Sequence, residues 1–154
     1  MQVTATIRFL TPSLGNCRNE RRDKMLRDQQ GRVLYLQSWW RAGLGYAAQA
    51  LSRFEPDVIN IQADPVVEGH PEIYRRYYSE SGFKEHEAFL AGAEMKVKFC
   101  LPNRISPEDF KELLTVAGRY VGISPYGYRH DFGRFEVVTV EPYHGTKSAD
   151  PKSR

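Results

Sequence analysis

The strongest constraint on the fold is the alternation within residues 92–101, where an apolar side chain recurs at every second position from Ala93 to Leu101 and charged side chains stand between them at 94, 96 and 98. Met95 and Phe99 share one side of an extended chain, while Lys96 and Lys98 share the other. Because successive side chains of a strand point to opposite faces, this pattern predicts a strand with one buried and one solvated face. Strands of this kind are typical of antiparallel sheets that are covered on one side.

A helix with strong start signals follows this strand, and we expect it to span residues 107–118. Ser106 can act as its N-cap, Pro107 suits the first helical position, and Asp109 can close a box-like cap. The apolar side chains that recur at helical spacing form one stripe: Phe110, Leu113, Leu114, Ala117 and Val121.

Three further strands and one further helix complete the pattern. The strands are expected at residues 2–10, 57–62 and 134–141, and the helix at 38–52 with Ser38 as its cap. The resulting order is βαββαβ, which is the ferredoxin-like split βαβ motif. The sequence therefore predicts an α+β fold, with an antiparallel sheet, two helices and two long insertions.

The two insertions lie outside this pattern. Residues 13–32 are polar and basic, and residues 64–90 are rich in Pro, Gly, Tyr and charged side chains. Residues 33–36 form either an extra strand or part of the first insertion. We expect a single domain over residues 1–142, followed by a flexible tail at 143–154. Long insertions in a small domain are often functional.

Composition limits the cellular setting and the partners of the protein. The formal net charge is +3, which permits a polyanionic partner without requiring one. Cys17 and Cys100 show no disulfide or metal-binding spacing, and Cys100 falls in an apolar run that predicts a buried thiol. Neither a signal peptide nor an apolar run of about 18 residues is present, so we expect a cytoplasmic protein without a membrane partner.

A glycine-rich stretch, GISPYGYRHDFGRFEVV, lies between the second helix and the last strand, and TIRFLTPSLGN carries the first strand into a Thr-Pro break. In these features the sequence resembles the RAMP superfamily, the CRISPR-associated RNA-binding proteins whose backbone subunits form a filament on guide RNA. The resemblance implies RNA binding, insertions that grip the strand, and either a homo-oligomer or a place in a ribonucleoprotein complex. A phage-encoded relative would fit it as well.

Basic and aromatic side chains gather in three segments: the first insertion, the YRRYY stretch of the second insertion, and the glycine-rich stretch. Cationic groups neutralise phosphates, and rings stack on bases for roughly 1–3 kcal/mol per base. Glycines allow the backbone to approach a phosphate. The candidate nucleic-acid-binding residues are Arg18, Arg21, Arg22, Lys24, Arg27, Trp40, Arg75, Arg76, Tyr77, Tyr78, Tyr126, Gly127, Arg129, Gly133 and Arg134.

Each of these segments also has a purely structural interpretation. The first insertion can be a solvated loop whose charges compensate each other, the tyrosines can pack a loop onto the body, and the glycines can serve a tight connection. Arg, Tyr and Trp are also enriched at protein interfaces, so a phage structural or anti-defence interaction module is the alternative function.

Catalysis has little support in the sequence. No metal-ligand spacing is present, and the four histidines do not cluster. The remaining enzymatic alternative is a small ribonuclease that uses His130 and Asp131. The preferred interpretation is a non-enzymatic protein that binds single-stranded RNA or DNA, with no catalytic residue, no metal and no cofactor.

Overall fold

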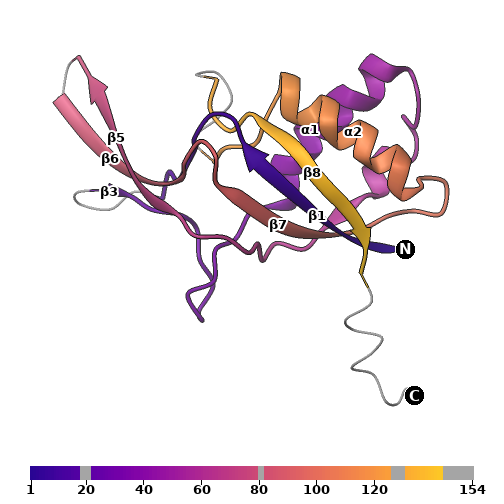
Figure 1. The fold of residues 1–154 in the computed structure, drawn as a ribbon, viewed down its shortest axis with the longest axis horizontal. Helices are drawn as coiled ribbons and strands as arrows, with labels where there is room; N and C mark the ends of the chain where they lie inside the picture. The colour runs from indigo at the N-terminus through magenta and orange to yellow at the C-terminus, as the bar shows by residue number, and fades with distance from the viewer. Residues whose placement is uncertain (18–21, 80–81, 126–130, 144–154) are drawn as a thin grey trace.

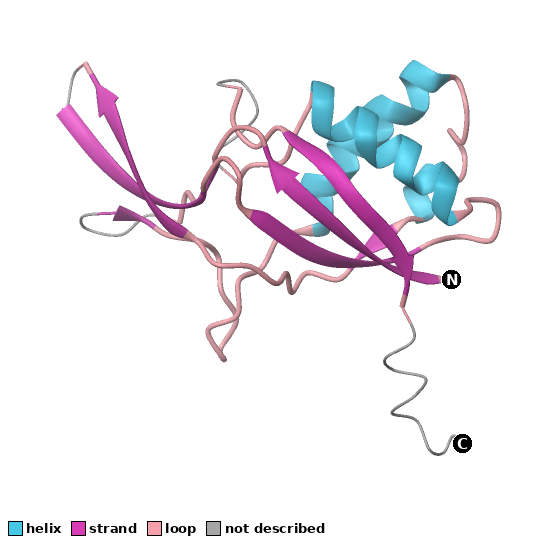
Figure 2. Cartoon of the chain, viewed as in Figure 1, coloured by secondary structure: helices cyan, strands magenta, loops and turns pink. Residues whose placement is uncertain are grey.

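The computed structural model describes residues 1–17, 22–79, 82–125 and 131–143, apart from the side chain of Tyr78. Two helices lie against one face of a four-stranded sheet, and a second sheet projects away from this body (Figures 1 and 2). The elements are β1 (Gln2–Phe9), β2 (Ser13–Leu14), β3 (Arg22–Asp23), α1 (Gln37–Leu51), a 3-10 turn (Val58–Asn60), β4 (Gln62–Ala63), β5 (Glu72–Tyr78), β6 (Gly82–Phe89), β7 (Glu94–Cys100), α2 (Pro107–Tyr120) and β8 (Phe135–Pro142).

The main sheet has the strand order β4-β7-β1-β8, and every neighbouring pair in it is antiparallel. With α1 between β1 and β4, and α2 between β7 and β8, this is the ferredoxin-like arrangement, so the predicted α+β fold is confirmed.

The strand predicted at residues 57–62 was misplaced. Residues 58–60 form a 3-10 turn, and the strand β4 covers only Gln62–Ala63. The Gln37 side chain holds this short edge in place, because its amide nitrogen donates to the Ile61 carbonyl (2.8 Å) and its amide oxygen accepts from the Ala63 N–H (2.6 Å).

The two helices begin differently. The predicted cap of α2 is confirmed: the Ser106 hydroxyl accepts from the Asp109 N–H at 3.0 Å, and the Asp109 carboxylate accepts from the Ser106 N–H at 3.3 Å. The predicted Ser38 cap of α1 is wrong, because Leu36 occupies the N-cap position and no side chain caps the helix. The helices pack closely at Gly43, where an added Cβ would lie 3.0 Å from the Ala117 Cβ.

The core lies between the main sheet and the helices, and Trp40 is one of its central rings. Only 3% of Trp40 is exposed, and its ring centroid lies 5.2 Å from that of Phe99 and 6.2 Å from that of Phe135. Cys100, in contrast, is exposed, so the predicted buried thiol is wrong. The alternation that buries Phe99 necessarily turns its neighbour outward.

The second insertion contains a regular element that the sequence did not predict, the β5–β6 hairpin. β6 is central in a second sheet, with β5 and β2 as antiparallel partners and β3 as a parallel partner. Residues 33–36 contribute isolated bridges, at Val33 and Leu34, rather than a strand. Neither described helix is long and apolar enough to cross a membrane.

Candidate nucleic-acid interface

Two exposed rings lie opposite each other on the projecting hairpin. Tyr77 and Phe83 are register partners in β5 and β6, their ring centroids are 5.3 Å apart, and each residue is 62% exposed. The Arg75 guanidinium lies 4.6 Å from the Phe83 ring centroid on the same face. Exposed rings beside a guanidinium offer stacking surfaces to a base and a charge to a phosphate. We call Arg75, Tyr77 and Phe83 the hairpin ring cluster.

The first insertion is bound to β6 by ion pairs. The Arg22 guanidinium lies 2.7 Å from the Glu85 carboxylate, and the Arg27 guanidinium lies 2.7 Å from that of Glu87. Two of the predicted phosphate contacts are therefore already paired with carboxylates. Lys24 is exposed and makes no ion pair with the described residues.

A buried polar cluster fixes the same junction. His86 is fully buried, and its Nδ1 lies 2.9 Å from the Gly15 carbonyl and 3.7 Å from the Asp23 carboxylate. The Lys84 ammonium lies 3.1 Å from the same Asp23 oxygen. These contacts join β3 and the Gly15 segment to β6.

The glycine-rich stretch is shaped by its backbone. Gly122 and Gly133 both have φ of +79°, and a Cβ on Gly133 would overlap the Ile123 carbonyl. The Gly133 N–H donates to the Pro12 carbonyl at 2.7 Å, and the Gly133 carbonyl accepts from the Ile123 N–H at 2.8 Å. The Gly133 N–H, which was predicted to approach a phosphate, therefore already donates a hydrogen bond within the fold.

Arg134 and Phe132 connect this stretch to its surroundings. The Arg134 guanidinium donates to the Arg119 carbonyl at 2.5 Å and lies 3.0 Å from the Asp131 carboxylate. The Phe132 ring centroid lies 6.1 Å from that of Tyr74 and 5.1 Å from the Arg76 guanidinium. The glycine-rich stretch and the first insertion thus both contact the hairpin.

Of six other predicted contacts, one is buried and five lie outside the described residues. The buried Trp40 ring offers no face to a base, which corrects the prediction made for it. The remaining five lie outside the described residues, as does the His130 of the ribonuclease alternative; the side chain of Tyr78 is also not described. These five are Arg18, Arg21, Tyr126, Gly127 and Arg129.

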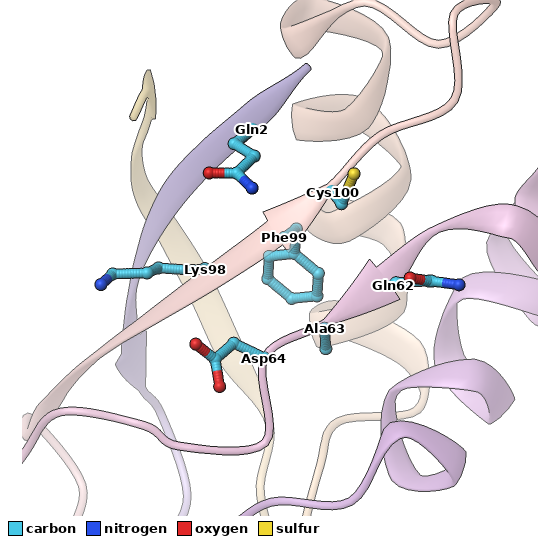
Figure 3. Close-up of a pocket in the computed structure, with 7 residues that line it drawn as sticks. All are labelled: Gln2, Gln62, Ala63, Asp64, Lys98, Phe99 and Cys100. Carbon is cyan, nitrogen blue, oxygen red and sulfur yellow. The ribbon is translucent and has the colours of Figure 1, made fainter. Parts of the chain in front are cut away.

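The open face of the main sheet carries two adjoining pockets that the sequence analysis did not single out. One, of about 220 Å³, lies between β4 and β7 and is drawn in Figure 3. The other, of about 470 Å³, shares Asp64 and Lys98 with it. The Lys98 ammonium lies 4.4 Å from the Tyr143 ring centroid and 3.2 Å from its hydroxyl. The sequence signal that could have indicated this face is the pair of outward-pointing lysines in residues 92–101, Lys96 and Lys98.

One wall of the larger pocket is a turn supported by Asp28. The Asp28 carboxylate accepts from the backbone N–H groups of Arg32 and Gln30, each at 2.9 Å, and from the Arg32 guanidinium at 2.7 Å. The hydrogen bond from the Arg32 backbone, supported by its guanidinium and by Gln30, holds the pKa of Asp28 below its usual value.

Two observations concern metal binding and acid–base chemistry in the part of the chain that the structure describes. No group of three His, Cys, Asp or Glu side chains there could hold a metal ion. Asp131, the described half of the predicted acid–base pair, is paired with Arg134.

Comparison with known proteins gives a likeness of fold. No protein-family model and no curated protein matches the sequence. The structure is similar to a chain in the cryo-EM structure of the Type III-B Cmr-beta bound to cognate target RNA, with a TM-score of 0.56 and 11% sequence identity. The alignment covers 91% of this chain and 59% of that chain. The protein therefore shares its fold with a longer chain of that RNA-bound complex.

Proposed function

We propose that this protein binds single-stranded nucleic acid, RNA foremost, without cleaving it, as a RAMP-like subunit of a ribonucleoprotein complex. The observation that carries this proposal is the hairpin ring cluster, which presents two exposed rings and a guanidinium on a projecting arm. The likeness of fold to a chain of an RNA-bound complex supports it.

The ring cluster suits a single strand better than a duplex. Bases of a single strand can unstack onto protein rings, whereas a duplex keeps its own bases stacked. Arg75 can remain against Phe83 and still reach a phosphate with the outer edge of its guanidinium. Lys24 adds an exposed cation on the neighbouring insertion, and we propose that Arg18, Arg21 and Arg129 add further phosphate contacts.

Fluorescence anisotropy with a labelled 12-nucleotide oligouridine tests this function. Phe83→Leu keeps an apolar side chain and removes the ring, and we expect affinity to fall about tenfold, as for the loss of one stacked base. Tyr120→Leu is a matched control, because Tyr120 is 54% exposed and belongs to α2, a helix that lies away from the hairpin (Figure 1). Binding that is insensitive to Phe83→Leu, or absent at low salt, would contradict the proposal.

A second candidate function, a protein-interaction module, is favoured by the outer face of α1. This helix has one charged residue, Arg41, and its exposed Tyr46 lies 6.1 Å, centroid to centroid, from the exposed Tyr120 of α2. A helix face with few charges and exposed rings is typical of protein contacts. If this candidate is correct, the substitutions Tyr46→Ala and Tyr120→Ala will weaken the association of the protein with itself, measured by light scattering. The wild-type protein will then bind no RNA at any salt concentration.

A further inference from the structure

We propose that the larger pocket on the open face of the main sheet binds one ribose-phosphate unit of RNA, with Glu68 accepting a hydrogen bond from the 2′-hydroxyl. This inference rests on the proposed RNA-binding function and specifies the class of nucleic acid. It concerns a surface separate from the hairpin ring cluster.

Three parts of the chain build this pocket. The main sheet supplies Thr4, Lys96 and Lys98, the second insertion supplies Asp64, Val66 and Glu68, and the first insertion supplies Arg32. Its volume of about 470 Å³ lies within the usual range for small-ligand sites. Both insertions, which are additions to the basic fold, thus converge on one small site.

The backbone places carboxylates beside ammonium groups. Lys96 and Glu68 exchange both backbone hydrogen bonds, each at 2.9 Å, so their side chains leave the same face as direct neighbours. Asp64 is joined to the next outward lysine by one backbone hydrogen bond, in which its N–H donates to the Lys98 carbonyl at 2.7 Å. Figure 3 shows the Asp64 and Lys98 side chains from these adjoining segments.

The charged groups of Lys96, Lys98 and Glu68 can meet a ligand, whereas the Asp64 carboxylate already accepts a hydrogen bond from the Val66 N–H at 3.0 Å. Within the described residues, the side chains of Lys96 and Glu68 make no ion pair and no hydrogen bond, and both residues are exposed. Among the residues that the structure describes, the Lys98 side chain contacts the Tyr143 ring and hydroxyl and makes no ion pair. The Arg32 guanidinium, in contrast, is engaged by Asp28, so it shapes the wall without adding a free charge.

This combination of charges selects a ligand that carries both an anion and hydroxyl donors. Two lysines and two carboxylates balance each other, so a bare phosphate gains little net attraction, and the lysines oppose a metal cation. A ribose-phosphate unit can place its phosphate on Lys96 and Lys98 and donate its 2′-hydroxyl to Glu68. DNA offers the same phosphate but no 2′-hydroxyl, so Glu68 would face it without a donor.

The residues that line the pocket also indicate which part of a nucleotide it does not recognise. None of the described residues that line it is aromatic, so none of them offers a ring on which a base can stack. We therefore expect this site to distinguish RNA from DNA without a preference for base sequence.

Anisotropy with three 12-nucleotide probes tests the inference: oligouridine RNA, its 2′-O-methyl form, which cannot donate from that position, and oligodeoxyuridine. We expect the wild-type protein to bind RNA about five- to tenfold more tightly than the other two probes. Glu68→Gln keeps the size of the side chain. It should lower the affinity for the RNA probe to that for the other two probes, and leave the affinity for those two unchanged. Lys96→Ala should lower affinity for all three probes alike. Glu55→Gln is the control, because Glu55 is exposed and outside the pocket.

The outcomes separate this inference from the proposed function. If Glu68→Gln leaves the preference for RNA intact, or weakens all three probes equally, the 2′-hydroxyl assignment is overturned. If RNA binding depends on Phe83 but on neither Glu68 nor Lys96, the pocket is overturned and the proposed function stands. If the wild-type protein binds none of the probes, both are overturned.

Discussion

The Arg22 guanidinium lies 2.7 Å from the Glu85 carboxylate, and the two residues are register partners in the parallel β3–β6 pair. The Arg22 guanidinium, which the sequence analysis predicted to contact a phosphate, is therefore paired with a carboxylate of the hairpin. The same holds for Arg27, which is paired with Glu87. Nucleic acid that approaches the first insertion must compete with these carboxylates, so the net charge of the segment overstates its attraction for phosphate.

Glu85→Gln is expected to release Arg22 and to raise RNA affinity about two- to fivefold at low salt, with a steeper dependence on salt. The pair is partly exposed, so the free energy of unfolding should fall by no more than about 1 kcal/mol. Anisotropy titrations at several salt concentrations measure the affinity, and urea denaturation measures the stability. If the dependence of RNA affinity on salt concentration is the same for Glu85→Gln and the wild-type protein, Arg22 does not reach the nucleic acid.

Arg75 and Phe83 are expected to stabilise each other as a cation–π pair of about 0.5–1 kcal/mol. A double-mutant cycle with Arg75→Met and Phe83→Leu isolates this coupling in urea denaturation. Additive effects of the two substitutions would mean that the exposed pair does not persist in solution.

Gly133→Ala is expected to destabilise the fold by about 3 kcal/mol or more, because it combines a positive φ with overlap of the new Cβ and the Ile123 carbonyl. Gly82→Ala is the matched control, since Gly82 has the same φ of +79° and open space around its Cα. We expect the control to cost only about 1–2 kcal/mol. Equal losses in urea denaturation would contradict the steric explanation.

The turn at residues 28–32 is expected to loosen only at strongly acidic pH. Because the folded protein lowers the pKa of Asp28 from 3.8, its carboxylate stabilises the turn fully above that value and loses this effect as pH falls through the lower, folded-state pKa. Amide NMR shifts of Gln30 and Arg32, which both donate to Asp28, should titrate together with a midpoint below 3.8. A midpoint at or above 3.8 would refute this.

Local periodicity in the sequence was enough to predict most of the body. The alternation around Met95 predicts β7, and the Ser106–Asp109 cap with its apolar stripe predicts α2. These signals are local, since a residue's neighbours at spacing two or 3.6 determine which face it shares. The βαββαβ order and the open, lysine-bearing face of the sheet follow from them.

Only the tertiary structure decided which charges are free and which rings are exposed. Arg22 and Glu85 are 63 residues apart, and no local pattern reports that they will pair. The hairpin has polar side chains on both faces, so it lacks the alternation that reveals a strand, and its exposed Phe83 was missed. Glu68 and Lys96 meet only because the second insertion bridges to β7. The availability of a side chain depends on its partners in space, and long-range register chooses those partners.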